Sequence, residues 1–394
     1  MSNGRNGGAA IAHVAYLIDT LSCDTAGTQK QLLETIRRLD RARYIPLLVC
    51  LWESPWMRTA DLPCEVVSLG HRGFLKAGFP GVVRRLGRLF DDRAIDLVQV
   101  FFDEAIFVGW LGARASRRRP VLVSSRRDMG LGAANQPWYH RLFPVVFPLV
   151  NRDYTAIIAN SEMVRRHASR RERTPLAKYR LVRNGVAFPA PGEVAAAVAG
   201  AASPVAGVAC VASLTPVKRH DVLLRAWAGL PDAASAGPRH LYLLGEGPER
   251  GRLEALARTL GIEGTVTFAG AVTDVSARLA GMQLGVLCSD REGLSNAILE
   301  YMACGLPVVA TAVGGNPELV DDANGVLVPP GDPDALGAAI ARLLGDAAAR
   351  GRLGAASRER ITGQYAWDAA MNALLGCYDD LLAARRPVRT DSSA

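Results

Sequence analysis

Short apolar runs alternate with amphipathic helical patterns along most of this chain of 394 residues. Such alternation is typical of parallel α/β domains, because each buried strand needs a helix to return the chain to the same edge of the sheet. The runs form two series, separated by a proline- and alanine-rich passage at residues 188–204. The first series predicts strands at residues 12–18, 45–51, 65–69, 97–101, 121–124, 156–159 and 180–182. The second predicts strands at residues 205–212, 240–244, 266–269, 284–288, 308–311 and 325–328.

The fold class predicted by this pattern is α/β, with two doubly wound, Rossmann-like parallel sheets. We expect a first domain at residues 1–187, a linker at 188–204 and a second domain at 205–367. Ligands bind such sheets at the carboxyl ends of the strands, so the pattern places a ligand cleft between the two domains.

Charge is distributed unevenly over the two halves. Residues 1–187 carry 29 Lys+Arg and 16 Asp+Glu, whereas the remainder carries 17 and 22. A basic first half suggests an anionic partner such as a membrane surface, a phosphorylated lipid or a nucleic acid. The alternative is that arginine is simply abundant, since the chain has 42 arginines and only four lysines.

The seven cysteines are scattered singly, which argues against a zinc knuckle or a disulfide framework and fits a reducing cytoplasm. No apolar run is long enough for a transmembrane helix, and the first twenty residues fit a strand better than a secretory signal. We therefore expect a cytoplasmic protein.

The stretch at residues 289–317, SDREGLSNAILEYMACGLPVVATAVGGNP, contains two carboxylates, Glu292 and Glu300, around a turn that opens a helix. Free N–H groups and the macrodipole at a helix N-terminus attract an anion such as phosphate. Glu300 lies about two turns into the helix, at about 3.6 residues per turn. One element thus offers a phosphate cradle and two acceptors for hydroxyl groups, which suits a nucleotide-sugar. The turn residues are Gly293, Leu294, Ser295 and Asn296.

This stretch resembles the retaining glycosyltransferases of family 4, which have the GT-B fold. The family signature E-x7-E matches Glu292 and Glu300, and M-A-x-G-x-P-V-V matches residues 302–309. The G-G-x-x-E segment matches Gly314, Gly315 and Glu318. The resemblance implies that the first domain binds the acceptor and the second the donor, and that residues 368–394 return to the first domain as a helix and tail.

The resemblance also implies roles for the donor site. Glu300 would accept hydrogen bonds from the ribose, and Glu292 would hold hydroxyl groups of the donor sugar. Lys218, which follows the first strand of the second domain, would neutralise the leaving diphosphate together with the N–H groups of the turn. The family has an arginine where this chain has Ser213, and Arg219 is a candidate to replace its charge.

Two further loops are donor-binding candidates through the same resemblance. Gly27 lies in the loop after the first strand, where the family reads G-G-T-E and this chain reads A-G-T-Q. The segment GEGPERG, from Gly245, follows a strand and is expected near the nucleotide base, with Val272 and Asp274 close by. Its G-x-G-x-x-x-G spacing does not match the dinucleotide fingerprint G-x-G-x-x-G, which argues against NAD.

In the first domain, SSRRDMG follows a predicted strand and offers Arg126, Arg127 and Asp128 as acceptor-binding candidates. Many family members have a histidine near this place, and an arginine pair is suited to a phosphate or an acidic acceptor. The segment at residues 137–152 mixes aromatic side chains and arginines with an apolar face. It fits either a helix lying on a membrane or, as we favour here, a partly buried helix bent by Pro144 and Pro148.

Asp332 and Asp334 spell D-x-D, but a proline follows Asp332, so we predict an N-cap rather than a metal site. The sequence therefore indicates a metal-independent retaining transferase without a cofactor, which uses a nucleoside-diphosphate-sugar, with a UDP-sugar favoured. The expected acceptor is a glycan or a lipid-linked molecule of surface polysaccharide or glycolipid synthesis. Peripheral contact with the inner face of an anionic cytoplasmic membrane is also expected, and nucleic acid is not. The alternatives are a nucleotide-dependent oxidoreductase or sugar epimerase, a basic nucleic-acid-binding protein and an inactive, regulatory transferase homologue.

Overall fold

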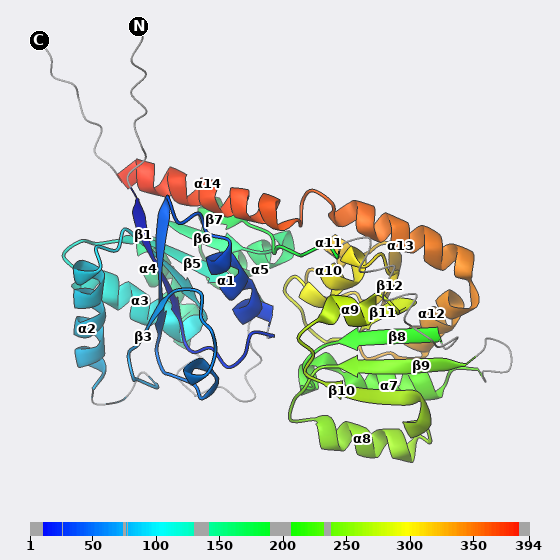
Figure 1. The fold of residues 1–394 in the computed structure, drawn as a ribbon. Helices are drawn as coiled ribbons and strands as arrows, with labels where there is room; N and C mark the ends of the chain where they lie inside the picture. The colour runs from blue at the N-terminus through cyan, green and yellow to red at the C-terminus, as the bar shows by residue number, and fades with distance from the viewer. Residues whose placement is uncertain are drawn as a thin grey trace, which may run out of the picture.

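A computed structural model describes residues 11–25, 27–73, 76, 78–129, 142–189, 206–231 and 238–385. The first domain is built on a seven-stranded sheet with the order β3-β2-β1-β4-β5-β6-β7, and every neighbouring pair is parallel (Figure 1). Its strands are β1 (Ala12–Ile18), β2 (Tyr44–Cys50), β3 (Glu65–Ser68), β4 (Leu97–Phe101), β5 (Val121–Arg126), β6 (Ala156–Ala159) and β7 (Tyr179–Leu181).

Helices cover both faces of this sheet, because both of its faces are apolar. Apolar side chains of α1 pack on one face, and those of α2, α3 and α4 pack on the other. Helix α5 packs beside β6 and β7. The helices are α1 (Gly27–Arg37), α2 (Phe79–Asp92), α3 (Asp103–Ala115), α4 (Phe143–Asp153) and α5 (Glu162–Arg171).

The second domain repeats this arrangement with a six-stranded parallel sheet in the order β10-β9-β8-β11-β12-β13. Its strands are β8 (Ala206–Val211), β9 (Arg239–Leu244), β10 (Val266–Gly270), β11 (Leu284–Leu287), β12 (Val308–Thr311) and β13 (Gly325–Val328). Its helices are α7 (His220–Ala228), α8 (Arg250–Thr259), α9 (Val275–Leu279), α10 (Asn296–Ala303), α11 (Asn316–Leu319), α12 (Pro333–Gly345) and α13 (Ala347–Ile361).

The last helix, α14 (Trp367–Arg385), leaves the second domain and packs on the first sheet (Figure 1). Met371, Leu374 and Tyr378 belong to the same buried cluster as the side chains of β1. The Tyr378 hydroxyl donates to the buried side chain of Gln99 in β4. Arg43 forms an ion pair of 2.6 Å with Asp379 at the edge of this interface.

The predicted fold class is confirmed: thirteen parallel strands form two doubly wound sheets, as the apolar runs indicated. In each sheet the strand order reverses beside the first strand of the domain, so the carboxyl ends of β1 and β4, and of β8 and β11, mark the expected ligand site. None of the described helices is both long and apolar enough to cross a lipid bilayer. Most of the expected linker lies outside the described residues, as do Gly130 and the first part of the segment at 137–152.

Candidate active site

The turn between β11 and α10 contacts the first domain. Ser295 caps α10, since its Oγ accepts a hydrogen bond of 3.3 Å from the amide of Ile298. A Cβ at Gly293 would lie 2.0 Å from the carbonyl oxygen of Arg127, at the end of β5. Only glycine permits so close an approach of two backbones. The N-terminus of α10 is thereby fixed at the cleft between the domains.

Glu292 enters this turn already paired with a cation. Its Oε1 accepts a bond of 2.6 Å from Nζ of Lys218 and another of 2.6 Å from Oγ of Ser289. The side chain of Glu292 is 10% exposed and that of Lys218 is 22% exposed. The Lys218–Glu292 pair therefore offers a ligand both a positive charge and an acceptor oxygen.

Glu300 is paired with a cation from the other domain. Nζ of Lys30, in the first turn of α1, lies 2.6 Å from Oε1 of Glu300. Both side chains remain accessible to solvent, at 36% and 14% exposure. Lys30 was not among the residues predicted from the sequence, because its partner is 270 residues away.

Asn296, the first residue of α10, joins the two domains through hydrogen bonds. Its Nδ2 donates to the carbonyl of Gly27 at 3.1 Å, and its Oδ1 accepts from Nδ2 of Asn184 at 2.7 Å. Gly27 opens α1, so the N-termini of α1 and α10 meet at the interface between the domains. Two helix N-termini that converge in this way create a region of positive potential suited to an anion such as diphosphate.

The loop after β8 brings Lys218 into the cleft but leaves Arg219 engaged elsewhere. Arg219 has a left-handed backbone, with φ of 50°. Its guanidinium lies 3.1 Å from Asp290 and 3.3 Å from Asp221, and these carboxylates raise the pKa of Arg219. This arginine is therefore a poor replacement for the charge that the family has at Ser213. Ser213 itself is exposed, with its Oγ 3.5 Å from Oγ1 of Thr215.

Gly245 and Val272 have structural roles in this fold. A Cβ at Gly245 would lie 2.0 Å from the carbonyl oxygen of Ala212, so the glycine is required by the packing of two backbones after β8 and β9. Val272 packs against the apolar cluster beneath α10. Asp274 caps α9 through the amide of Ala277. None of these three structural roles requires a ligand.

The three acceptor-binding candidates after β5 separate into different environments. Arg126 is buried, and its Nε and Nη2 bind Glu172 at 2.6 Å and 2.9 Å. This placement does not fit the predicted acceptor contact, because the guanidinium is committed to a carboxylate inside the first domain. Arg127 lies at the domain interface, where Nη1 donates to Asn184 at 2.9 Å, and burial lowers its pKa to about 10. Asp128 is exposed beside Gly293.

The G-G-x-x-E segment holds the domains together. A Cβ at Gly314 would lie 1.8 Å from the carbonyl oxygen of Glu292, so this glycine supports the turn before α10. Glu318 reaches the first domain, where its carboxylate accepts bonds of 3.0 Å and 2.7 Å from the amides of Glu162 and Met163. A carboxylate at these amides stabilises the N-terminus of α5.

The predicted N-cap role of Asp332 is confirmed: its Oδ1 accepts a bond of 2.9 Å from the amide of Ala335 at the start of α12. Within the described ranges, no three or more His, Cys, Asp or Glu residues are grouped so as to hold a metal ion.

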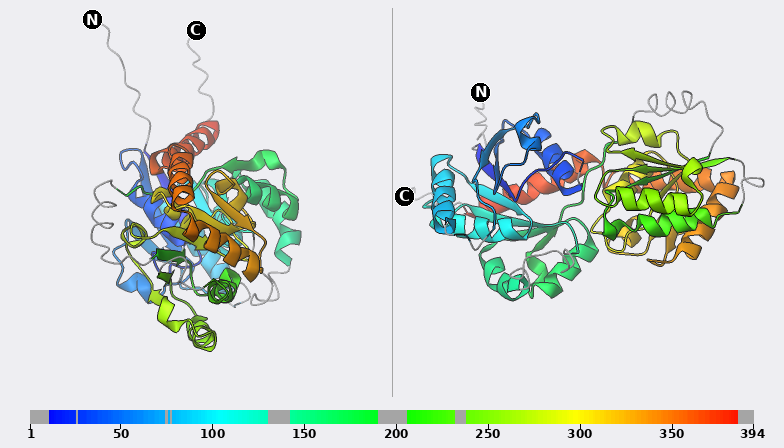
Figure 2. Two further views of the ribbon diagram at one scale, coloured as in Figure 1. Left: turned by 90° about the vertical axis from the view of Figure 1, so that its right-hand side faces the viewer. Right: turned by 90° about the horizontal axis from the view of Figure 1, so that it is seen from below.

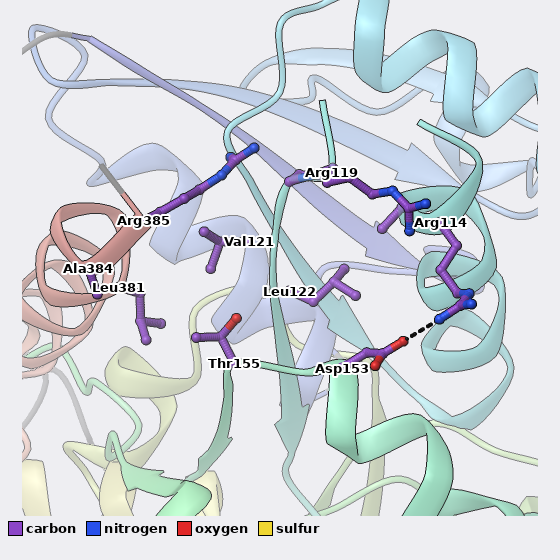
Figure 3. A pocket seen from close by; sticks show the side chains of 11 residues that line it. Arg114, Arg119, Val121, Leu122, Asp153, Thr155, Leu381, Ala384 and Arg385 are labelled. Atoms are coloured by element: carbon purple, nitrogen blue, oxygen red, sulfur yellow. Dashed lines mark hydrogen bonds and ion pairs between the residues drawn. The ribbon is translucent and has the colours of Figure 1, made fainter. Parts of the chain in front are cut away.

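A separate hollow of about 480 Å³ lies at the amino ends of β5 and β6, away from the strand ends that carry the site (Figure 3). Its rim carries Arg114, Arg119 and Arg385, and its wall includes Val121 and Leu381. It does not contain any of the predicted donor-site residues.

Two family models match the chain. The one described as "Glycosyl transferases group 1" matches residues 206–346, and the one described as "Glycosyl transferase 4-like domain" matches residues 26–185. The matches divide the chain in the same way as the two sheets.

Curated relatives match over part of their length. The chain is 37% identical over 159 residues to the lipopolysaccharide core biosynthesis glycosyltransferase LpsE of Rhizobium meliloti, covering 40% of this chain and 45% of the relative. It is 37% identical over 195 residues to the D-inositol 3-phosphate glycosyltransferase of Salinispora tropica, covering 47% of this chain and 40% of the relative. The chain therefore matches less than half the length of these relatives.

Solved structures match over the whole fold. Anabaena HepE in complex with UDP superimposes with a TM-score of 0.78 at 20% identity, covering 93% of this chain and all of HepE. Sucrose-phosphate synthase of Thermosynechococcus elongatus gives a TM-score of 0.79 at 22% identity, covering 95% of this chain and 100% of the synthase. The two family matches place the chain among the group 1 and family 4-like glycosyltransferases, and the solved structures show that it shares their two-domain GT-B fold.

Proposed function

We propose that the chain is a retaining glycosyltransferase that takes its sugar from a nucleoside-diphosphate donor. The observation that carries this proposal is the convergence of two carboxylates, two lysines and two helix N-termini at one cleft. Hydroxyl groups of a ribose and a sugar need acceptor oxygens, and a diphosphate needs positive charge and N–H donors. Acceptor oxygens, positive charge and N–H donors are all present at or near the N-terminus of α10.

Each site residue has a role in this proposal. Glu300 accepts hydrogen bonds from the ribose, which must therefore displace or share the ammonium of Lys30. Glu292 holds donor-sugar hydroxyl groups and balances positive charge that develops on the sugar ring in an oxocarbenium-like transition state. Lys218 and the amides of Gly293, Leu294 and Ser295 stabilise the departing diphosphate.

The proposed chemical step is the same-face displacement that the family resemblance implies, and the placement of these residues is compatible with it. The bond from the anomeric carbon to the phosphate oxygen breaks, and a bond to the acceptor hydroxyl forms on the same face of the sugar. The leaving phosphate takes the proton of that hydroxyl, so the step does not require a separate general base. Positive charge from Lys218 and the N-terminus of α10 supports a reaction without a divalent cation, and the employment of Asp332 as a helix cap is in keeping with this.

The relatives support a proposal for the class of substrates. The curated relatives include a lipopolysaccharide core biosynthesis enzyme and a D-inositol 3-phosphate glycosyltransferase, and HepE has been solved with UDP and with UDP-glucose. We propose that this chain acts in surface polysaccharide or glycolipid synthesis on a glycan or lipid-linked acceptor, with a UDP-sugar as donor.

Thermal unfolding against UDP, GDP, ADP, dTDP and NAD tests the donor site. At about a hundred times its Kd, a ligand stabilises the folded state by about 2.7 kcal/mol, which is a rise of several degrees in Tm. We expect one nucleoside diphosphate to raise the Tm of the wild type and, at the same concentration, to raise the Tm of Glu300→Ala by a smaller amount. A rise with NAD alone would overturn the proposal in favour of an oxidoreductase. If the chain binds a nucleoside diphosphate but transfers sugar to none of the glycan or lipid acceptors offered, the result would support the alternative of an inactive transferase homologue.

A further inference from the structure

Helix α4 presents an apolar stripe to solvent on its outer side. Leu142, Val145, Val146 and Leu149 are exposed by 51%, 76%, 37% and 55%. Their spacing of three and four residues places them on one face of the helix. These four residues account for half of the large apolar side chains that are exposed in the described part of the chain. Single exposed apolar residues need no explanation, but a continuous stripe marks an interaction surface.

The opposite side of α4 is packed against the first domain. The stripe is therefore exposed while the helix is in its folded position. Phe143 and Phe147 are buried against Phe107, with ring centroids 4.4 Å and 5.4 Å from it. Near the end of α4, the buried Asn151 donates to Glu172 at 2.7 Å and to Thr174 at 3.0 Å. The helix is thus held by its opposite face while the stripe remains uncovered. The described part of the segment at 137–152 is therefore a partly buried helix, as favoured from the sequence, with an exposed apolar face.

Arginines continue the stripe and flank it. Arg152 follows Leu149 by three residues, so it extends the same face, and it is exposed. Arg170 and Arg173 are exposed as well, and the residues next to them, Glu172 and Thr174, accept bonds from Asn151 near the C-terminal end of α4. The nearby carboxylates already have cationic partners: Asp153 pairs with Arg114 at 2.9 Å, and Glu162 pairs with Arg165 and Arg166. The uncompensated charge around the stripe is positive.

We propose that the outer face of α4, with Arg152, Arg170 and Arg173, is the surface through which this protein docks on an anionic lipid bilayer. The stripe would lie in the plane of the interface with its apolar side chains among the acyl chains, and the arginines would contact lipid phosphates. Figure 2 shows the green helices of this region on the outside of the first domain, where a flat surface can approach them. The basic rim of the hollow near Asp153 adds positive charge beyond the C-terminal end of α4 (Figure 3).

A second copy of the chain fits this surface less well than a bilayer does. In a twofold dimer the same patch meets itself, so arginines would face arginines across the interface. An anionic bilayer supplies both the apolar phase and the opposite charge. The proposal concerns location and is independent of the proposed transferase chemistry.

Vesicle sedimentation of the full chain tests the surface. We compare the wild type with the double variant Val145→Glu, Leu149→Glu on vesicles of phosphatidylcholine alone and with about 30% phosphatidylglycerol. We expect binding to the anionic vesicles that weakens as salt is raised, and a loss of about tenfold or more in the double variant. Ile11→Glu is the control, because Ile11, the residue before β1, is 51% exposed and lies outside the stripe, so the change should leave binding unchanged.

A triple variant, Arg152→Gln, Arg170→Gln, Arg173→Gln, separates the charge from the apolar stripe. It should lose binding to anionic vesicles while the Tm stays at the wild-type value. Absence of wild-type binding, or equal binding of wild type and double variant, would overturn the proposal. So would a concentration-dependent dimer in light scattering that the double variant abolishes without any vesicle binding, since the stripe would then join two copies.

Discussion

The two signature glutamates are paired alike but are held by different parts of the molecule. Glu292 and Glu300 each accept a bond of 2.6 Å from a lysine ammonium. Lys218 belongs to the same domain as Glu292, whereas Lys30 reaches Glu300 from α1 of the other domain. The first pair is preserved whatever the relative position of the domains, and the second exists only while α1 faces α10. Under the proposed function, the charge for the leaving group therefore lies within the second domain, whereas ribose binding at Glu300 depends on the position of the first.

Of the substitutions at these two ion pairs, removing the charge of Lys218 is expected to have the largest effect on activity. Lys218→Met should lower kcat by about 100-fold to 1,000-fold, as for the loss of one group that stabilises transition-state charge. Steady-state turnover with the donor identified by thermal unfolding measures it. Lys218→Arg, which keeps the charge, should recover part of the rate. Unchanged turnover in Lys218→Met would contradict the role of this lysine at the leaving group.

Adding a charge at Ser213 should have a smaller effect of opposite sign. Ser213→Arg supplies the cation that the family has at this position, and because Ser213 is exposed the fold should tolerate it. We expect the nucleoside diphosphate to bind about tenfold tighter, as for one charge-assisted hydrogen bond, and the nucleoside alone to bind as before. Ser213→Gln, of similar length but neutral, is the control. Equal affinities in both variants would show that the diphosphate does not approach this loop.

Removing Lys30 should have a still smaller effect. The ribose competes with Lys30 for Glu300, so Lys30→Met should tighten nucleotide binding. The gain should stay below about fivefold, because a partly exposed ion pair contributes about 0–1 kcal/mol. Calorimetric titration of wild type and variant with the same nucleotide measures the change. Weaker binding in Lys30→Met would show instead that Lys30 contacts the donor directly.

Asp19 offers a contrast to the paired glutamates, because it lies beside other acidic groups at the carboxyl end of β1. Burial, with Glu104 and Asp103 nearby, raises the pKa of Asp19 to about 8 from 3.8, although its Oδ1 accepts a bond from the amide of Ala105. A folded-state pKa above the unfolded value means that stability is present at low pH and is lost as the pH rises through about 8. The Tm of Asp19→Asn should therefore exceed that of the wild type at pH 9 by more than at pH 5. Parallel Tm profiles for the two proteins would contradict this assignment.

The elements predicted well were those that depend on neighbours in the sequence. All thirteen strands and the helix cap at Asp332 follow from apolar runs and from the residues next to them. The pairing of Arg126 with Glu172 could not be predicted, because it depends on the packing of β5 against a residue 46 positions later. The close approach of Gly245 to Ala212 could not be predicted either, and its predicted contact with the donor stays a prediction.

Lys30 and the interdomain contacts of Asn296 were missed because their partners lie across the domain interface. One signal was present for Lys30: the chain has only four lysines, and two of them hold the two signature glutamates. In a chain that uses arginine almost everywhere, a lysine three residues after Gly27, at the start of α1, indicates a specific role for its ammonium group.

Calorimetric titration of the preferred nucleoside diphosphate into wild type and Glu300→Ala tests the central claim most directly. Loss of the ribose contacts should weaken binding by about tenfold or more, as for a hydrogen bond to a charged group, while the Tm of the free variant remains close to that of the wild type. Equal affinity in the two proteins would contradict the assignment of Glu300 to the donor ribose, and with it the account of the cleft as a donor site.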